Sequence, residues 1–235
     1  MSGDELLSII VPVFNEARTL RAVIDRLLAI DLPVPREIIV VDDGSTDGTG
    51  GVLDIAEGAG LPITILRAAQ NGGKGTAIRR GLEQSRGTIV AIQDADLELD
   101  PQQLAALVSP ILNGQTDVVY GSRFLAGRGG APRMTFAANR ALTTVTNVLF
   151  GASLTDMETC YKVMRTPVAR SLQLRAERFE IEPEITARLL RGGHRIHEVP
   201  VRFEPRSRAQ GKKIGWRDGV TALQVLIRER CARRR

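Results

Sequence analysis

The sequence contains few of the residues that build thiolate, disulfide or zinc sites. Its only cysteines, Cys160 and Cys231, are far apart, and no Cys-x-x-Cys pair exists. The two histidines, His194 and His197, flank the start of a predicted strand with no third ligand nearby, so a zinc site is not expected. Reduced thiols in a cytosolic protein are the default for this composition.

Long hydrophobic runs are also missing. No run approaches the roughly 18 apolar residues that a membrane-spanning helix needs, and residues 1–7 lack the basic and then apolar pattern of a signal sequence. We therefore expect a cytoplasmic protein, or one bound peripherally to the cytoplasmic face of a membrane. Aromatic residues make up only 4% of the chain and offer few stacking platforms for bases, so nucleic acid is not an expected partner.

What the sequence does have is positive charge, carried more by arginine than by lysine. The formal net charge is +5 and the sequence pI about 9.7. This balance favours partners that carry phosphate, such as a nucleotide or an anionic lipid headgroup, without choosing among them. With 235 residues, 43% of them apolar, the chain is long enough for one large domain with a full core.

Strand and helix patterns alternate four times in the first 120 residues. Apolar, β-prone runs predict strands at 8–14, 37–41, 62–66, 88–92 and 117–120, with helices between them, the first opening at Asn15. Further along, the spacing predicts helices at 134–150, 180–191 and 215–231 and strands at 159–164 and 195–203. The alternation predicts an α/β protein with a doubly wound, mostly parallel central sheet and flanking helices, in one domain over residues 1–235.

A short acidic stretch, residues 93–98, follows the predicted strand at 88–92. Asp94 and Asp96 leave the carboxyl end of that strand two positions apart, where both carboxylates can face one divalent cation such as Mg²⁺ or Mn²⁺. An Asp-x-Asp pair alone is weak evidence, because acidic turns are common. The stretch is not an EF-hand loop, since Leu99 replaces the glycine which that loop requires.

Residues 71–76 superficially suggest a phosphate-binding loop. A P-loop requires a glycine where Ala68 stands and a serine or threonine where Gly75 stands, and the dinucleotide fingerprint requires a glycine where Ile78 stands. Both interpretations fail on those residue types.

Several motifs taken together resemble one family. They occur in a fixed order, each at a predicted strand end or loop: 11–16 (VPVFNE), 41–47 (VDDGSTD), 71–75 (NGGKG), 94–96 (DAD), 121–123 (GSR), 156–162 (DMETCYK), 198–201 (EVPV), Arg206 and 211–216 (GKKIGW). The chain resembles family-2 glycosyltransferases with the GT-A nucleotide-diphospho-sugar fold. The later blocks are most similar to the dolichol-phosphate mannose synthase-like, polyprenyl-phosphate glycosyltransferase branch.

The resemblance assigns the first half, residues 1–123, to the nucleotide sugar. Asp94 and Asp96 would hold Mg²⁺ or Mn²⁺ against the diphosphate, with Glu98 as a third ligand where the synthases carry an amide oxygen. The full set of implied donor-binding residues is Pro12, Phe14, Glu16, Val41, Asp43, Asp94, Ala95, Asp96, Arg123, Arg206 and Lys212. Asp42 and Asp47 have a simpler role as a turn former and a helix cap.

The second half, residues 124–235, is assigned to the acceptor. Arg133 and Arg140 are weaker candidates for binding its phosphate. The implied catalytic set is Asp96, Arg123, Asp156, Arg206 and Lys212. Among the carboxylates available as a base, Asp156 and Glu158, we expect Asp156 to orient first and to act as a base second.

The function implied by the resemblance is a metal-dependent, inverting transfer of a hexose from GDP-mannose or UDP-glucose to a polyprenyl or dolichyl phosphate. A lipid phosphate is already ionised at neutral pH and needs no strong general base, whereas a hydroxyl acceptor does. A hydroxyl acceptor on a saccharide or small molecule remains an alternative, as does a catalytically silent nucleotide-sugar-binding protein.

Membrane contact is expected to be peripheral. Family members often add C-terminal membrane spans, and this sequence has none. The helices predicted at 134–150 and 215–231 are amphipathic and carry arginines, which suits a bilayer interface. Packing of the same apolar stripes on the core is an equally good interpretation.

Overall fold

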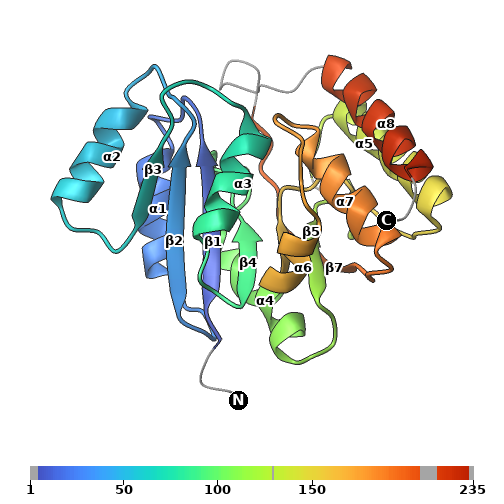
Figure 1. Ribbon diagram of the computed structural model, residues 1–235, viewed down its shortest axis with the longest axis horizontal. Helices are drawn as coiled ribbons and strands as arrows, with labels where there is room; N and C mark the ends of the chain where they lie inside the picture. Colours follow the sequence, from blue (N-terminus) through green and yellow to red (C-terminus); the bar gives the residue numbers. More distant parts are fainter. Residues whose placement is uncertain (1–4, 129, 207–215, 233–235) are drawn as a thin grey trace.

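The computed structural model describes residues 5–128, 130–206 and 216–232, and a seven-stranded sheet runs through it (Figure 1). The strand order is β3-β2-β1-β4-β6-β5-β7; β6 is antiparallel to both of its neighbours, and the other pairs are parallel. The strands are β1 (Leu7–Val13), β2 (Arg36–Asp42), β3 (Thr64–Arg67), β4 (Ile89–Ile92), β5 (Val118–Ser122), β6 (Lys162–Arg165) and β7 (His197–Pro200). The predicted α/β class with a mostly parallel sheet is confirmed.

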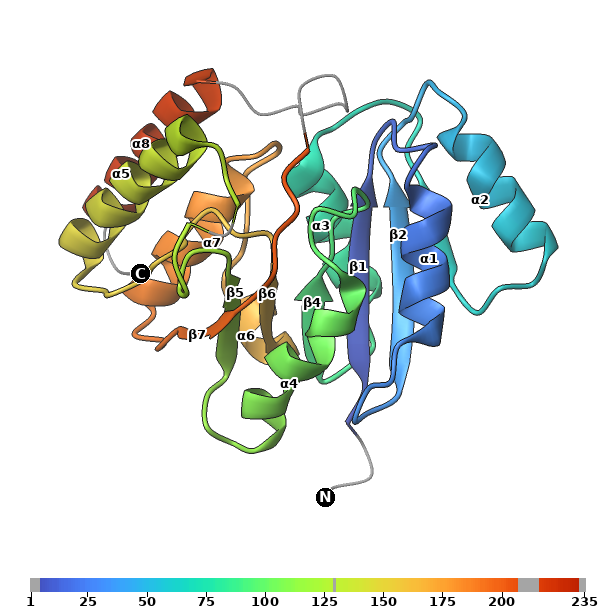
Figure 2. The same ribbon diagram turned by 180° about the vertical axis from the view of Figure 1, so that it is seen from behind.

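Helices cover both faces of the sheet. Figure 1 shows α3 and α6 in front of the strands, and the reverse view in Figure 2 shows α1 and α4 in front of them. Helices α5, α7 and α8 pack on one another at the end of the molecule beyond β7. The helices are α1 (Leu20–Ala29), α2 (Thr49–Gly58), α3 (Lys74–Gln84), η1 (Pro101–Gln103), α4 (Leu104–Leu112), α5 (Arg133–Phe150), α6 (Thr166–Ser171), α7 (Ile181–Arg191) and α8 (Trp216–Cys231).

The central strands carry the core. Every residue of β4 is buried, and β1 is buried at all but one position. Runs of this kind, with no polar alternation, are typical of parallel strands covered on both faces. The two strands pair in register from Leu7 opposite Ile89 to Ile10 opposite Ile92, so the acidic stretch that follows β4 emerges beside the end of β1.

The sheet topology brings distant motifs to one edge. The carboxyl ends of the parallel strands β1, β2, β3, β4, β5 and β7 all lie at that edge, which is where ligands bind in open α/β sheets. Since β6 is antiparallel, its beginning reaches the same edge, and residues 156–162 arrive beside Arg123 and Asp94.

The prediction that the first helix opens at Asn15 is wrong: α1 begins at Leu20. Asn15 has a left-handed backbone with φ of 55°, and its side-chain oxygen accepts a hydrogen bond from the Thr46 amide at 2.8 Å. The asparagine therefore fastens the end of β1 to the loop after β2 instead of starting a helix, because asparagine tolerates this conformation and bonds well to nearby backbone.

The second half of the chain departs further from the prediction. Strand β6 covers residues 162–165 and β7 covers 197–200, both shorter than predicted, and α6 between residues 166 and 171 was not predicted. Because β6 lies between β4 and β5, both halves of the sequence contribute to one sheet. In the described part of the chain, no helix is long and apolar enough to cross a membrane.

Candidate active site

The loop after β3 is drawn toward the end of β2 by a single carboxylate. Asp43 is 3% exposed, and its two oxygens accept hydrogen bonds from the amides of Gly72 and Gly73 at 3.0 and 2.6 Å. This fixes the backbone that leads into α3 and to Lys74. Asp43 thus has a clear structural role, in addition to the ribose contact that the resemblance implies.

Lys74, which the sequence analysis did not assign, is the centre of a buried ion network. Its ammonium lies 2.7 Å from Asp94 Oδ1 and 2.9 Å from Glu182 Oε1, and Glu182 also pairs with the fully buried Lys162. Burial by itself lowers the pKa of Lys74, but the carboxylates of Asp94 and Glu182 raise it well above its usual value. Lys74 therefore remains charged and links the acidic stretch to α7.

A second ion cluster holds the other aspartate. Arg206 places one guanidinium nitrogen 2.8 Å from Asp96 Oδ2 and another 3.0 Å from Glu16 Oε2. Its backbone amide donates a hydrogen bond of 2.7 Å to Glu98 Oε1. The structure thus brings together four residues of the predicted site from three distant parts of the sequence.

Asp94 and Asp96 are close enough for the charge of one to disfavour ionisation of the other. Burial, followed by the charge of Asp94, raises the pKa of Asp96 to about 7, despite the nearby Arg206. Burial also acts to raise the pKa of Asp94, but Lys74 and, more weakly, Arg123 hold it below its usual value. Two close carboxylates of which one resists ionisation are the arrangement that a divalent cation relieves.

Asp94 and Asp96 therefore fit a cation, and Glu98 as a third ligand stays a prediction. Across residues 5–128, 130–206 and 216–232, no three His, Cys, Asp or Glu side chains gather as a metal site. A cation bound by the two aspartates would need its other ligands from the donor's phosphate oxygens and water, as Mg²⁺ commonly does.

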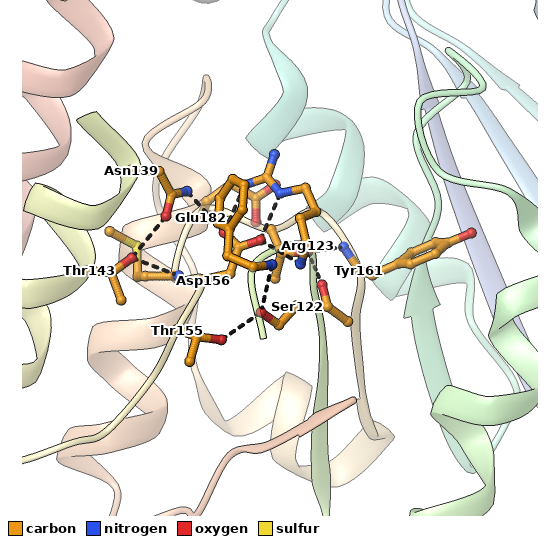
Figure 3. A network of polar contacts seen from close by, with 12 residues as sticks. Ser122, Arg123, Asn139, Thr143, Thr155, Asp156, Tyr161 and Glu182 are labelled. Carbon is orange, nitrogen blue, oxygen red and sulfur yellow. Dashed lines mark hydrogen bonds and ion pairs between the residues drawn. The ribbon is translucent and has the colours of Figure 1, made fainter. Parts of the chain in front are cut away.

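A further charged centre at this edge is formed by Arg123 and Asp156, shown in Figure 3. The guanidinium of Arg123 makes a two-pronged ion pair with the fully buried Asp156, with Nε–Oδ2 and Nη2–Oδ1 distances of 2.7 and 2.8 Å. The Arg123 amide adds a bond of 3.0 Å, and Asn139 on α5 adds one of 2.9 Å. Burial alone would raise the pKa of Asp156, but Arg123 and Asn139 hold it below its usual value.

This geometry favours the orienting role of Asp156 over the role of a base. Both of its oxygens already accept two hydrogen bonds each. The backbone amide of Asp156 is in turn held by Glu198, through a bond of 3.0 Å. Asn139 and Glu198 lie far from Asp156 in sequence and are positioning residues that the sequence analysis missed.

Two aromatic rings and a cavity surround Arg123. Its guanidinium carbon lies 5.2 Å from the ring centres of both Phe124 and Phe203, which are cation–π distances. A cavity of about 290 Å³ opens beside it; its lining residues are Ser122, Arg123, Ala126, Pro200, Val201, Arg202 and Phe203. The cavity joins the ends of β5 and β7, so it combines a fixed cation with an apolar wall.

Three other residues of the predicted site make no contact with these ion pairs that the structure records. Val41 is fully buried with Ile10, Ile39 and Ala77 beneath α3, so only its backbone is available to a nucleotide. Arg133 and Arg140 are exposed on α5, and their role in binding the acceptor phosphate stays a prediction.

Pro12, Phe14 and Ala95 lie at the ends of β1 and β4, on the expected edge. Lys212 lies outside the described residues. Asp42 accepts a bond from the Ser45 amide at 3.0 Å, which confirms its role as a turn former. Asp47 accepts a bond from the Thr49 amide at 2.9 Å, but the N-cap residue of α2 is Gly48.

Comparison with known proteins gives this arrangement a family. The family model described as glycosyl transferase family 2 matches residues 8–172, which is more than half of the chain. The chain belongs to this family. The match covers the strands β1 to β6, apart from Leu7, and includes the charged residues of the site apart from Glu182, Glu198 and Arg206.

Curated relatives are enzymes of polyprenyl phosphates. The undecaprenyl-phosphate mannosyltransferase of Micrococcus luteus is 29% identical, over 92% of this chain and 90% of that protein. The dodecaprenyl-phosphate galacturonate synthase of Rhizobium johnstonii is 28% identical, over 88% of this chain. The dolichol-phosphate mannosyltransferase of Pyrococcus furiosus is also 28% identical, over 89%. The chain spans only 61% and 59% of the length of the last two.

Solved structures share the fold. Glucosyl-3-phosphoglycerate synthase from Mycobacterium tuberculosis, in complex with phosphoglyceric acid, has a TM-score of 0.75 at 22% identity, covering 97% of this chain and 80% of that one. The same enzyme in complex with Mn²⁺, UDP and glucosyl-3-phosphoglycerate has a TM-score of 0.73 at 21% identity, with the same coverage. The GT-A fold predicted from the sequence is confirmed.

Proposed function

We propose that this protein transfers a hexose, in a divalent-cation-dependent reaction, from a nucleotide-diphospho-sugar to a polyprenyl phosphate, with inversion at the anomeric carbon. The observation that carries the proposal is the presence at one sheet edge of two different charged centres, a crowded aspartate pair and a fixed arginine. Relatives named for polyprenyl-phosphate substrates support the acceptor.

The donor is assigned to the side of Asp94 and Asp96. A bound cation would supply Lewis-acid stabilisation of the charge that develops on the leaving diphosphate. Arg206 and Lys74 hold the two carboxylates in place at 2.8 and 2.7 Å and add positive charge beside the phosphates. Glu16 keeps Arg206 oriented through its own ion pair.

The acceptor is assigned to the side of Arg123. Its guanidinium is fixed by Asp156 and by two rings, so it offers a preorganised charge to a phosphate at little entropic cost. The cavity beside it has apolar and basic walls, which suits a phosphate that is followed by a hydrocarbon chain. Arg133, Arg140 and Lys212 remain proposed as further phosphate contacts.

The proposed displacement needs no strong base. An ionised lipid phosphate oxygen attacks the anomeric carbon while the bond from that carbon to the nucleoside diphosphate breaks, and the electron pair leaves with the diphosphate. Because Asp156 accepts four hydrogen bonds, its carboxylate is committed to holding Arg123. A single direct attack inverts the configuration.

A peripheral position at a membrane is part of the proposal. Helices α5 and α8 pack side by side (Figure 1), and both expose large apolar side chains: Met134 is 83% exposed, Val148 78% and Ile227 49%. Arg140 and Arg217 are exposed on the same two helices. Other predicted apolar positions, such as Leu226, pack on the core.

The deciding experiment measures transfer of labelled sugar into an organic-extractable product. Reactions contain polyprenyl phosphate, Mg²⁺ or Mn²⁺, and GDP-mannose or UDP-glucose in parallel, with a chelator control. Label in the lipid phase that disappears with the chelator supports the proposal and identifies the donor. Donor hydrolysis without lipid product would contradict the acceptor assignment and favour a hydroxyl acceptor. No turnover of any donor would favour a binding protein.

A further inference from the structure

Glu158 is a half-buried glutamate with one buried, unsatisfied carboxylate oxygen. This atom, Oε1, has no hydrogen-bond partner in the part of the chain that the structure describes. Among the described residues the same holds for Oε1 of Glu182 and of Glu184, but these two oxygens face Lys74 and Arg188 in ion pairs at 2.9 and 2.7 Å. Glu158 has no such pair. Buried polar atoms without partners are uncommon and costly, so this one calls for a ligand.

The backbone places Glu158 between the two halves of the site. Two residues before it, Asp156 binds Arg123. Two residues after it, the thiol of Cys160 lies against Asp94. The segment 156–160 therefore runs from the acceptor side to the donor side, and Glu158 is at its midpoint.

Charged groups from both sides of the site influence Glu158. They are Lys162 on β6, Glu182 on α7, Arg123 after β5, and Asp156 on its own segment. Burial, which is the largest influence, raises the pKa of Glu158 to about 7, with Lys162 acting in the opposite direction. A carboxyl group in this setting is a hydrogen-bonding group that no protein partner uses.

We propose that Glu158 binds a hydroxyl group of the transferred sugar and helps to determine which sugar is accepted. The inference rests on the proposed function. The reacting sugar lies between the donor diphosphate and the acceptor phosphate, and the segment 156–160 runs between the two charged centres that are proposed to bind them. A phosphate is an unsuitable ligand because it would be repelled by the ionised carboxylate and by neighbouring Glu182 and Asp156. A neutral hydroxyl both donates and accepts, and it satisfies Oε1 in either protonation state.

The test separates the sugar from the nucleotide. Dissociation constants are measured by calorimetry for UDP and UDP-glucose, and for GDP and GDP-mannose, with Mg²⁺ present. In each pair, the dissociation constant of the nucleoside diphosphate is divided by that of the nucleotide sugar. This ratio reports how much the sugar contributes to binding. In Glu158→Ala we expect the ratio to fall about tenfold or more, because one buried hydrogen bond is lost, while the constant for the nucleoside diphosphate stays unchanged.

Glu229→Ala is the matched control. Glu229 is a buried glutamate, at 5% exposed, but it pairs with Arg188 and Arg191 on α7, at 3.2 and 2.8 Å. Its loss should lower the melting temperature without changing the sugar ratio. Should Glu158→Ala not fold, Glu158→Gln keeps the shape, and its discrimination between UDP-glucose and UDP-galactose should change severalfold.

The outcomes distinguish this inference from the proposed function. If the wild-type protein binds no nucleotide sugar and transfers no sugar, the proposed function fails. If the wild type shows a sugar preference that folded Glu158→Ala keeps in full, only the role of Glu158 is overturned. A Glu158→Gln variant with unaltered epimer discrimination would overturn it as well.

Discussion

The two carboxylate clusters of the site have opposite electrostatic character. Asp156, on the acceptor side, is satisfied by the protein itself, with four hydrogen bonds and a pKa below its usual value. Asp96, on the donor side, has a pKa raised to about 7 by burial and by Asp94, even with Arg206 beside it. Asp156 is fully satisfied without a ligand, whereas the pKa of Asp96 stays raised although Lys74 and Arg206 pair with the two aspartates.

The difference indicates where binding changes the electrostatics. A saturated pair such as Asp156 with Arg123 keeps its geometry when a substrate arrives and acts by preorganisation. A crowded pair such as Asp94 with Asp96 gains most from a ligand that brings charge. We therefore expect the cation beside Asp94 and Asp96 and the acceptor phosphate beside Arg123, as proposed.

The largest expected effect comes from Asp96→Asn or from a chelator. Either change should reduce sugar transfer by about a hundredfold or more, because charge stabilisation of several kcal/mol is lost at the leaving diphosphate. The stability of Asp96→Asn should be unchanged or higher, since the charged form of this side chain is disfavoured at neutral pH. Transfer rates and urea denaturation of the same preparation measure the loss of activity and the stability. Full activity in this variant would contradict the proposal that Asp94 and Asp96 bind a divalent cation.

Asp156→Asn should lower the stability of the protein strongly and its transfer activity only moderately. Removing one partner of a buried ion pair leaves Arg123 without its counter-charge, and we expect a loss of about 3–5 kcal/mol in the free energy of unfolding. Transfer to a lipid phosphate should fall only moderately, whereas transfer to a hydroxyl acceptor would fall by roughly 10²–10⁴ if Asp156 were its base. Denaturant titration and assays with both acceptors separate the cases.

Gly75→Ala should weaken the donor side by a steric route. A Cβ at this position would stand 2.3 Å from the Ala176 carbonyl oxygen, so α3 and Lys74 must shift. We expect a loss of about 1–3 kcal/mol in stability and weaker donor binding. The control is Gly51→Ala on α2, where nothing lies within 4 Å, and which should be neutral or slightly stabilising. Equal melting temperatures for the two variants would contradict the close approach.

The smallest effect concerns pH. A carboxyl whose pKa is raised on folding binds more protons in the folded than in the unfolded state, so Glu158 should cost stability as pH rises from about 4.5 through 7. Glu158→Gln removes this titration, and its stability relative to the wild type should increase by roughly 1–3 kcal/mol between pH 5 and pH 8. Parallel melts at the two pH values measure the difference. A constant difference would show that Glu158 titrates normally.

The first half of the chain was easier to predict than the second for a physical reason. In the first half, each strand is followed by a helix, so the local period of apolar residues is enough. In the second half, β6 inserts antiparallel between β4 and β5, and α6 follows it without a gap. These choices depend on contacts between segments far apart in the sequence, which no local pattern contains.

The same contrast holds for the candidate site. The motifs predicted that Asp94, Asp96, Arg123 and Asp156 would belong to it. They did not predict Lys74 as the partner of Asp94. The sequence did contain a signal for Lys74, because the Gly-Gly-Lys-Gly stretch follows a strand whose end lies at the same sheet edge. Since this stretch does not match a P-loop, its lysine was not assigned a role.

The sequence by itself determined the α/β class, the family resemblance and the residue types at the site, because apolar periodicity and motif order are local properties. Only the tertiary structure decided which charges neutralise one another. Ion pairing depends on distance and burial, and the fold alone brings Arg206 to Asp96, Asn139 to Asp156 and Glu182 to Lys74. For the same reason, only the fold shows that Glu158 is left without a partner.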